Sequence, residues 1–295
     1  MLRQSCRRGT TLIELLVVLL LLALVGGAIM RIAIGQQRFL DAVERVIEVH
    51  RTAREGADIP REELRAIAAA SGGIYAMASD HLEFRSLTGS SVICNVDSAR
   101  TTLSIPGRLA WSGLTSWVAA PREGDTVLVF GAASDTLPSR WRAHTLVGPP
   151  APGGRCPVAS GLARTAAEQS DALSFQITPP LEPSSGGGAP LRFFRRARYQ
   201  LYRAGDARWY LGFFDCAPAR ATPCSTIQPV SGPFTPEGVR FSYRDSTGAI
   251  TADPTRVARI DILSRAASDA SLRAMGFALG IYSDSVLASI SLRNR

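Results

Sequence analysis

The residue that most invites a chemical explanation is Glu14, which interrupts an apolar run beginning near Thr10 (TTLIELLVVLLLLALVGG). No other charged side chain occurs between this glutamate and Arg31. An ionised carboxylate is unfavourable in hydrocarbon unless a cation or hydrogen-bond donors accompany it. The sequence therefore predicts either a partner for Glu14 or a position at the lipid headgroups, where the charge stays hydrated.

The cysteines could support a second kind of chemistry, disulfide formation. Cys6 lies in a basic N-terminal lead, and the other four lie far beyond the apolar run: Cys94, Cys156, Cys216 and Cys224. Four cysteines in a polar region downstream of a membrane segment indicate two disulfides and an oxidising compartment. Of the three pairings, we favour Cys216 with Cys224, which closes the short loop CAPARATPC, and this leaves Cys94 with Cys156. C-x-x-C spacings and neighbouring histidines, which a zinc site needs, are absent.

Enzymatic chemistry has little support in the sequence. Only three histidines could act as bases: His50, His81 and His144. There is no G-x-S-x-G, H-E-x-x-H, Walker or Rossmann glycine pattern. The segment DSTGAITAD contains Asp245 and Asp253 but lacks the spaced oxygen ligands of a calcium loop, so a hairpin turn is favoured. We therefore expect no catalytic residue, no metal and no cofactor.

Length and composition indicate a folded chain with an apolar end. The 295 residues suffice for a membrane anchor and one sizeable domain, with 46% hydrophobic and 20% charged residues. The net charge of +8 falls to 8 − 3 = +5 without the three arginines of the lead. A basic cluster at 192–203 (RFFRRARYQLYR) alternates with aromatic residues, as in a half-buried strand. Nucleic-acid binding is therefore not expected.

The element that must position Glu14 is a long N-terminal helix. Residues 10–32 reach the roughly 20 residues that a helix needs to cross a bilayer. The basic lead, residues 1–9, places the N-terminus in the cytoplasm and the bulk of the chain outside. Arg31 is expected to extend its charge to the outer interface. The flexible or close-packing points are expected at three glycines: Gly26, Gly27 and Gly35.

The helix is predicted to continue beyond the membrane to about Arg54 or residue 55. Its apolar residues there fall on one face: Phe39, Leu40, Val43, Val46 and Ile47. Asp41 and Arg45 have the favourable i,i+4 order. A start signal at Asp58 and a Gly-Gly stop at Gly72 predict a separate second helix.

Residues 56–295 are predicted to form one mainly β extracytoplasmic domain, with no boundary inside it. Short segments rich in β-branched and aromatic residues are bounded by turn formers. The predicted strands are 81–89, 91–96, 101–105, 125–131, 140–147, 172–178, 256–266 and 285–295, with hairpins at 195–216 and 239–251. The fold class is therefore α+β, a long N-terminal helix followed by a mainly antiparallel sheet.

The segment GTTLIELLVVLLLLALVGG resembles the cleavage and methylation signal of prepilins and pseudopilins, usually Gly-Phe-Thr-Leu-Ile-Glu-Leu before an apolar run. Gly9 matches the residue before the cut, and Thr10, where the family normally has phenylalanine or methionine, matches the new N-terminus. The resemblance implies that a prepilin peptidase cuts after Gly9 and methylates the Thr10 amine. It also implies that Glu14 pairs with the Thr10 amine of a neighbouring subunit. An ordinary signal peptide would have a shorter apolar core that ends in a small-residue cleavage site. A simple signal anchor would explain the apolar run but not Glu14.

The order of helix and sheet also fits the pilin architecture. Within the family, the hairpin at 195–216 and the strand at 256–266 are most similar to the J-type pseudopilins of type II secretion and the W-type minor pilins. The resemblance implies a non-enzymatic subunit that initiates or caps a filament at the inner membrane, spans it once and meets other pilins and an assembly platform. The alternatives are a type IV pilus subunit for adhesion or DNA uptake, and a signal-anchored extracytoplasmic binding protein or enzyme.

Overall fold

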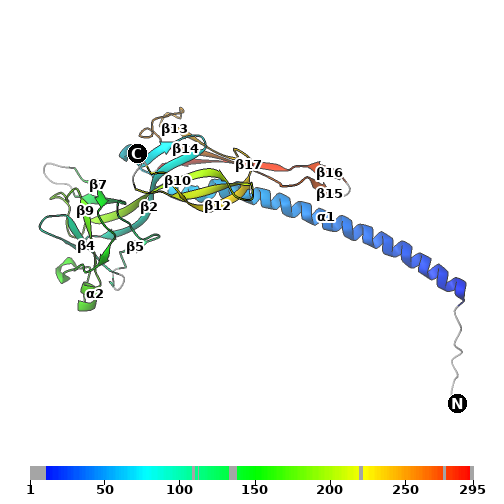
Figure 1. Ribbon diagram of the computed structural model, residues 1–295, viewed down its shortest axis with the longest axis horizontal. Helices are drawn as coiled ribbons and strands as arrows, with labels where there is room; N and C mark the ends of the chain where they lie inside the picture. Colours follow the sequence, from blue (N-terminus) through cyan, green and yellow to red (C-terminus); the bar gives the residue numbers. More distant parts are fainter. Residues whose placement is uncertain are drawn as a thin grey trace, which may run out of the picture.

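The structure, a computed structural model, describes residues 11–107, 110–111, 113–132, 138–218, 222–274 and 277–292. The lead with Cys6, and the predicted cleavage residues Gly9 and Thr10, lie outside these ranges. One long helix is followed by antiparallel strands, which confirms the predicted α+β class. Figure 1 shows the N-terminal half of the helix projecting from a β-rich body.

Helix α1 runs without a break from Leu12 to Leu64, about 80 Å at 1.5 Å per residue. The expected end near Arg54 and the separate helix starting at Asp58 are therefore wrong. Pro60 lies inside the helix, where its missing N–H removes one hydrogen bond. The last turns are retained because one side of them is buried against the sheets, and this packing outweighs the local signals. The Gly-Gly stop is reached through a 3-10 turn, η1 (Ala69–Ser71), which ends at Gly72 with φ +72°.

The buried face of α1 also differs from the predicted one. It consists mainly of small residues: Ala42, Val49, Thr52, Ala53, Gly56, Ala57, Pro60 and Leu64. The predicted apolar stripe stays largely outside, since Phe39, Leu40 and Ile47 are exposed. Small residues allow strands to approach the helix closely. At Gly56, an added Cβ would lie only 2.5 Å from Ser264 Oγ.

The larger sheet has twelve strands and contains the neighbour order β1-β2-β10-β6-β7-β9-β4-β3. These strands are β1 (Ile74–Met77), β2 (His81–Val92), β3 (Asn95–Val96), β4 (Thr102–Ile105), β6 (Thr126–Gly131), β7 (Arg140–Leu146), β9 (Leu173–Thr178) and β10 (Pro190–Arg203). Four more attach to them: β5 (Ser116–Trp117), β8 (Ala151–Pro152), β11 (Trp209–Asp215) and β12 (Thr226–Phe234). The hairpin predicted at 195–216 is confirmed as β10 and β11, paired from Ala197–Asp215 to Arg203–Trp209.

A separate three-stranded sheet packs on the helix. It contains β13 (Val239–Arg244), β14 (Arg259–Ala267) and β17 (Ser283–Ser291) in that order. The hairpin predicted at 239–251 is reduced to a turn with one bridge between Arg244 and Ile250, and β13 pairs along its length with β14. The short strands β15 (Leu272–Ala274) and β16 (Phe277–Gly280) form a hairpin, and the remaining helical turns are η2 (Val158–Ser160) and α2 (Ala166–Ser170).

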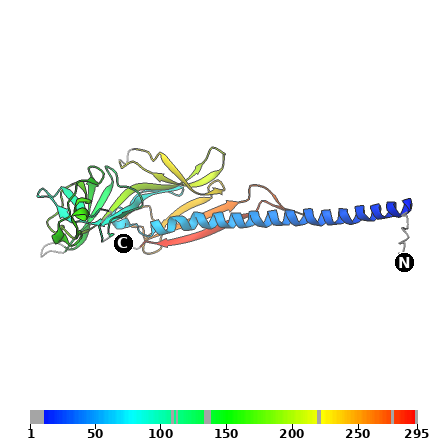
Figure 2. The same cartoon turned by 90° about the horizontal axis from the view of Figure 1, so that it is seen from below.

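The apolar side chains form two main clusters, which define two lobes. The proximal core joins α1 to the three-stranded sheet and to β10–β12, with Phe84, Tyr199 and Ile262 among its members. The distal core, with Val127, Phe175 and others, fills the far end of the large sheet. Strand β10 contributes to both, because Leu191 and Phe193 lie in the distal core and Ala197, Tyr199 and Leu201 in the proximal one. Figure 2 shows the proximal strands beside the helix and the distal lobe beyond its end.

Candidate functional site on the N-terminal helix

The N-terminal half of α1 is an exposed apolar surface. The large apolar side chains from Leu12 to Met30 are at least half exposed, and no residue of α1 before Ala42 is buried. Within the part of the chain that the structure describes, α1 is the one helix long and apolar enough to cross a membrane. In water this apolar surface would be strongly unfavourable, so the helix fits membrane anchoring.

Helix α1 begins with a threonine N-cap. Thr11 has extended backbone angles, and its Oγ1 accepts a hydrogen bond of 3.4 Å from the backbone N–H of Glu14. Glu14 therefore lies in the first turn, where the positive end of the helix dipole favours a negative charge. The Thr-x-x-Glu spacing of Thr11 and Glu14 is a local sequence signal for this cap, which was not predicted. Among the described residues, no cation pairs with the Glu14 carboxylate.

The glycines of the exposed segment leave open space beside the helix. A Cβ added at Gly26, Gly27 or Gly35 would have no neighbour within 4 Å. Arg31 is exposed between them. Close packing at these glycines is therefore not used within the described chain, and any such packing must come from another molecule.

Polar contacts fix the C-terminal half of α1 to the sheets. Glu63 accepts hydrogen bonds from the Tyr199 hydroxyl, at 2.8 Å, and from the Ser86 hydroxyl. Burial, with the charge of Glu63, raises the pKa of Tyr199, so this hydroxyl remains a donor. His50 lies with Nδ1 2.6 Å from an Asp284 carboxylate oxygen and Nε2 2.9 Å from the Tyr282 hydroxyl oxygen. These contacts set the direction in which the exposed segment leaves the body.

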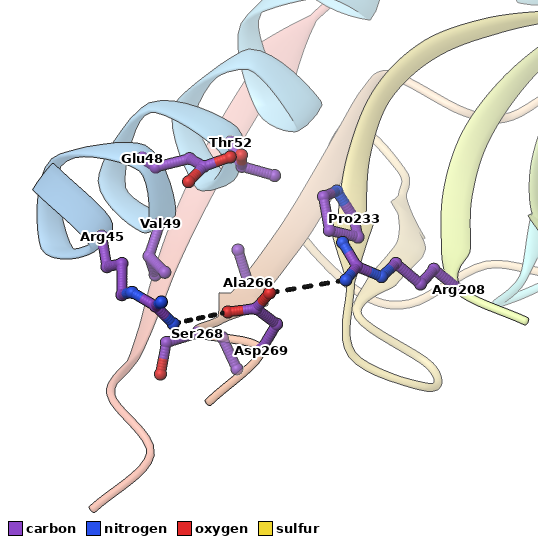
Figure 3. A pocket seen from close by; sticks show the side chains of 10 residues that line it. Arg45, Glu48, Val49, Thr52, Arg208, Pro233, Ala266, Ser268 and Asp269 are labelled. Carbon is purple, nitrogen blue, oxygen red and sulfur yellow. Dashed lines mark hydrogen bonds and ion pairs between the residues drawn. The ribbon is translucent and has the colours of Figure 1, made fainter. Parts of the chain in front are cut away.

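An exposed ionic bridge joins the same half of the helix to two loops (Figure 3). Arg45 Nη1 lies 3.1 Å from Asp269 Oδ1, and Arg208 Nη2 lies 3.4 Å from Asp269 Oδ2. Arg45 thus forms its ion pair with Asp269, which is distant in the sequence, and not with Asp41, the i,i+4 neighbour that the sequence suggested. Beneath the bridge is a cavity of about 40 Å³, which has room for water but not for a larger ligand.

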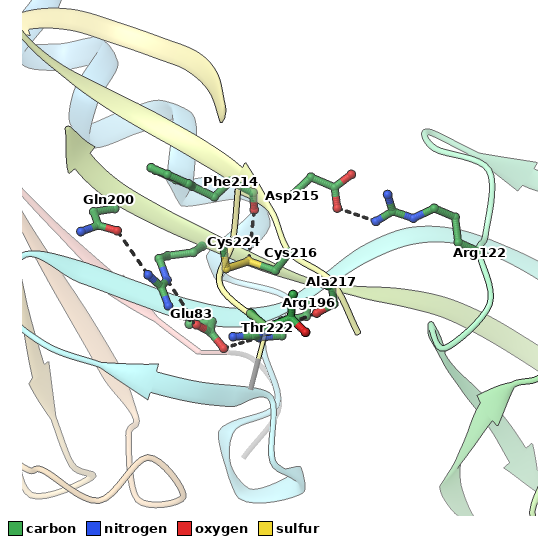
Figure 4. The surroundings of a disulfide bond; sticks show 11 residues. Glu83, Arg122, Arg196, Gln200, Phe214, Asp215, Cys216, Ala217, Thr222 and Cys224 are labelled. Atoms are coloured by element: carbon green, nitrogen blue, oxygen red, sulfur yellow. Dashed lines mark hydrogen bonds and ion pairs between the residues drawn. A yellow bond between two sulfur atoms is a disulfide. The ribbon is translucent and has the colours of Figure 1, made fainter. Parts of the chain in front are cut away.

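The strand-rich body contains two disulfides, and they join the cysteine pairs that the sequence analysis favoured. Cys94 and Cys156, with Cα atoms 5.1 Å apart, fix the loop that contains α2 against the distal lobe. Cys216 and Cys224, 4.2 Å apart, close the loop after β11 (Figure 4). Carbonyls of this loop, Ala217 O and Thr222 O, accept hydrogen bonds of 3.1 and 2.9 Å from Arg196. Both disulfides join residues that follow the apolar helix in the chain, which is consistent with the oxidising compartment predicted from the sequence.

Behind the second disulfide lies a buried charge cluster, also visible in Figure 4. Glu83 Oε1 is 2.5 Å from Arg196 Nε, and Oε2 is 2.7 Å from Arg198 Nη2. Burial alone would raise the pKa of Glu83, but the hydrogen bonds and charges of the two arginines outweigh it and lower the pKa. This cluster fastens β2 to β10, and it gives two residues of the basic segment 192–203, Arg196 and Arg198, a carboxylate partner within the chain.

The other side chains considered for chemistry have structural contacts. His81 lies 2.9 Å from Asp80, and His144 is buried with Nδ1 2.8 Å from Pro179 O. Asp245 accepts hydrogen bonds from the Thr247 hydroxyl and from nearby backbone amides, and these lower its pKa. Asp253 caps its own turn in the same way. Among the described residues, no cluster of three potential metal ligands is present.

Comparison with known families identifies the N-terminal segment. Residues 4–30 match the family described as the prokaryotic N-terminal methylation motif, and this range contains Gly9, Thr10 and Glu14. Comparisons with curated proteins and with solved structures found no match. The motif implies processing by a prepilin peptidase and assembly with other pilins. The chain thus carries a methylation motif on a single membrane-length helix, which supports a type IV pilin-like or pseudopilin subunit.

Proposed function

We propose that this protein is a minor pseudopilin or minor pilin, a non-enzymatic subunit that initiates or caps a filament at the inner membrane. The observation that carries the proposal is an exposed apolar helix whose one early acidic residue, Glu14, has no cationic partner among the described residues. Its cleavable lead stays in the cytoplasm, and the two disulfide-bonded lobes lie in the periplasm. A J-type subunit of type II secretion and a W-type subunit of a type IV pilus share these features.

The pairing chemistry follows from the position of the cut. Cleavage after Gly9 creates an amine on Thr10, directly before the Thr11 cap. A cation at this end of a helix is disfavoured by the dipole and by hydrocarbon, and Glu14 of a neighbouring subunit offsets both effects. Methylation keeps the amine basic and adds apolar surface. Because either charge alone is unfavourable in lipid, the pair selects one register between helices.

The exposed part of α1 supplies the remaining surface for assembly. Above the expected membrane span, Phe39, Leu40 and Ile47 continue the apolar surface on the side that the sheets leave uncovered. Gly26, Gly27 and Gly35 provide open grooves for a neighbouring helix. Both lobes lie at the other end of α1 (Figure 1), so neighbouring subunits can pack along the helices while the lobes remain available for other contacts.

The test begins with processing. Co-expression with a prepilin peptidase should remove nine residues and leave Thr10 as the methylated N-terminus, measured by mass spectrometry of the intact chain. An uncut chain, or one cut elsewhere, would contradict the family assignment.

Assembly is tested with Glu14→Gln and a matched control, Glu44→Gln, which changes an exposed glutamate farther along the same helix. Glu14→Gln should insert and be cleaved normally but enter filaments at least about tenfold less, since one buried charge loses its partner. Glu44→Gln should assemble like the unchanged protein. Equal incorporation of all three proteins would refute the pairing role while leaving the cleavage result intact.

A further inference from the structure

A cavity of about 420 Å³ lies where the segment after α1 meets the large sheet. Its sheet side is formed by Arg85 of β2, Arg192 and Phe194 of β10, Leu128 of β6, and Trp141 of β7. The strand register brings these together, because Arg192 lies opposite Leu128, which in turn lies opposite Ala143, two residues from Trp141. The volume is in the range of small-molecule sites.

Arg85 is a buried cation without a counter-charge. Its residue is 9% exposed, and among the described residues no carboxylate lies within 4 Å of its guanidinium. Its guanidinium donates a long hydrogen bond of 3.5 Å to Ser71 O and lies 5.2 Å from the centre of the Phe194 ring. Burial lowers the pKa of Arg85, which reflects the loss of hydration. A buried guanidinium in this condition is stabilised by any anion that reaches it.

Arg192 adds a second cation at the same cavity. Its guanidinium lies 4.7 Å from the centre of the Trp141 ring, and no described carboxylate pairs with it. Arg195, Arg196 and Arg198 of β10 each have a carboxylate partner, whereas Arg203, at the exposed end of the strand, has none among the described residues. Arg85 and Arg192 therefore line the cavity without a carboxylate partner among the described residues, and each lies beside an aromatic ring.

We propose that this cavity binds a carboxylate carried on an apolar, preferably aromatic, group. The guanidinium groups of Arg85 and Arg192 match the planar carboxylate with paired hydrogen bonds. Phe194, Trp141 and Leu128 supply the apolar wall against which the rest of the ligand packs. The site is independent of the filament function, since it lies in the body and uses no residue of the exposed helix segment.

The experiment uses the full chain in a nonionic detergent and 3-phenylpropionate as the probe, with binding measured by isothermal titration calorimetry. One saturable site is expected, with a dissociation constant in the sub-millimolar range that suits so small a ligand. Its neutral analogue, 3-phenylpropan-1-ol, should bind at least about tenfold more weakly, because a charge-assisted hydrogen bond is lost. Arg85→Gln and Arg192→Gln should each weaken the binding of 3-phenylpropionate by a similar factor.

Arg203→Gln is the matched control, since Arg203 is an exposed residue at the end of the same strand, away from the cavity. It should leave binding unchanged. If Arg85→Gln does not fold, Arg192→Gln still tests the site, because Arg192 is exposed and its replacement should not prevent folding. The proposal is overturned if the unchanged protein shows no saturable binding, if the alcohol binds as tightly as the acid, or if Arg203→Gln weakens binding as much as Arg192→Gln.

Discussion

The contact between α1 and the sheets can be tested at Gly56 by the substitution Gly56→Ala. An alanine Cβ there would lie 2.5 Å from Ser264 Oγ and 2.6 Å from Phe234 Cζ, closer than real atoms approach. Alanine favours a helix over glycine by about 1 kcal/mol. Overpacking of a buried site costs up to about 3 kcal/mol, and both neighbours are buried. The net expectation is a loss of about 2 kcal/mol, or about 4–8 °C in the unfolding midpoint.

The measurement is thermal unfolding of the full chain in detergent, followed by near-ultraviolet circular dichroism with the disulfides intact. Gly35→Ala is the control, because its Cβ would meet nothing within 4 Å, and it should not lower the midpoint of the body. The double variant Gly56→Ala with Phe234→Leu should lose less stability than the sum of the losses of the two single variants, as expected for residues in contact. A midpoint for Gly56→Ala at or above that of the unchanged protein would refute the close packing inferred here.

Three further predictions concern the charges and disulfides of the body. Glu83→Gln should lower the free energy of unfolding by about 3 kcal/mol, because it removes the carboxylate partner of the buried Arg196 and the half-buried Arg198. The exposed control Glu123→Gln should change it little in the same denaturant titration. Burial alone would raise the pKa of Asp261, but its hydroxyl and arginine partners outweigh burial and lower this pKa. The ionised Asp261 therefore stabilises the fold at pH values above the ordinary aspartate pKa of about 4. This contribution is lost as the pH falls through the lower pKa of the folded state. This predicts stability that is flat near neutral pH and declines in acid, and a decline on the alkaline side of pH 5 instead would contradict it. Non-reducing peptide mapping of the exported protein should recover Cys216 linked to Cys224, and free thiols at both positions would contradict an oxidising location.

Local patterns predicted much of the fold. The hairpin at 195–216 was predicted because alternating aromatic and basic residues flank the turn Ala204–Ala207, where Ala204 N donates to Arg208 O. Strand β12 was not predicted, and it contains Pro229 and Pro233, a residue type that disfavours strands. Among the described strands it pairs with β11 alone, so a proline without an N–H can occupy its outer edge.

Features that depend on distant contacts were missed. The helix continues through Pro60 because Phe234 and Ser264, far along the chain, pack on that face, and no local signal contains this information. For the same reason the buried stripe of small residues was not recognised beside the more apolar exposed one. Glu14 was found from the sequence because its significance lies in its spacing from Gly9, which is local. The carboxylate cavity requires Arg85 and Arg192 on neighbouring strands, which only the sheet register defines.

Strand β10 has a mechanical consequence through its place in both cores. In the filament that we propose, tension on a subunit enters through its helix, and any resistance met by the distal lobe is transmitted along the strands that connect the lobes. β10 and β2 pair over eleven positions, from Pro190–Val92 to Gln200–His81, and run antiparallel across this junction. Tension along them loads many hydrogen bonds together in shear rather than one at a time. The ion pairs of Glu83 with Arg196 and Arg198 cross the same two strands and resist their sliding. Under tension, the two lobes should therefore move as one rigid unit, and the contacts between the helix and the sheets should separate first.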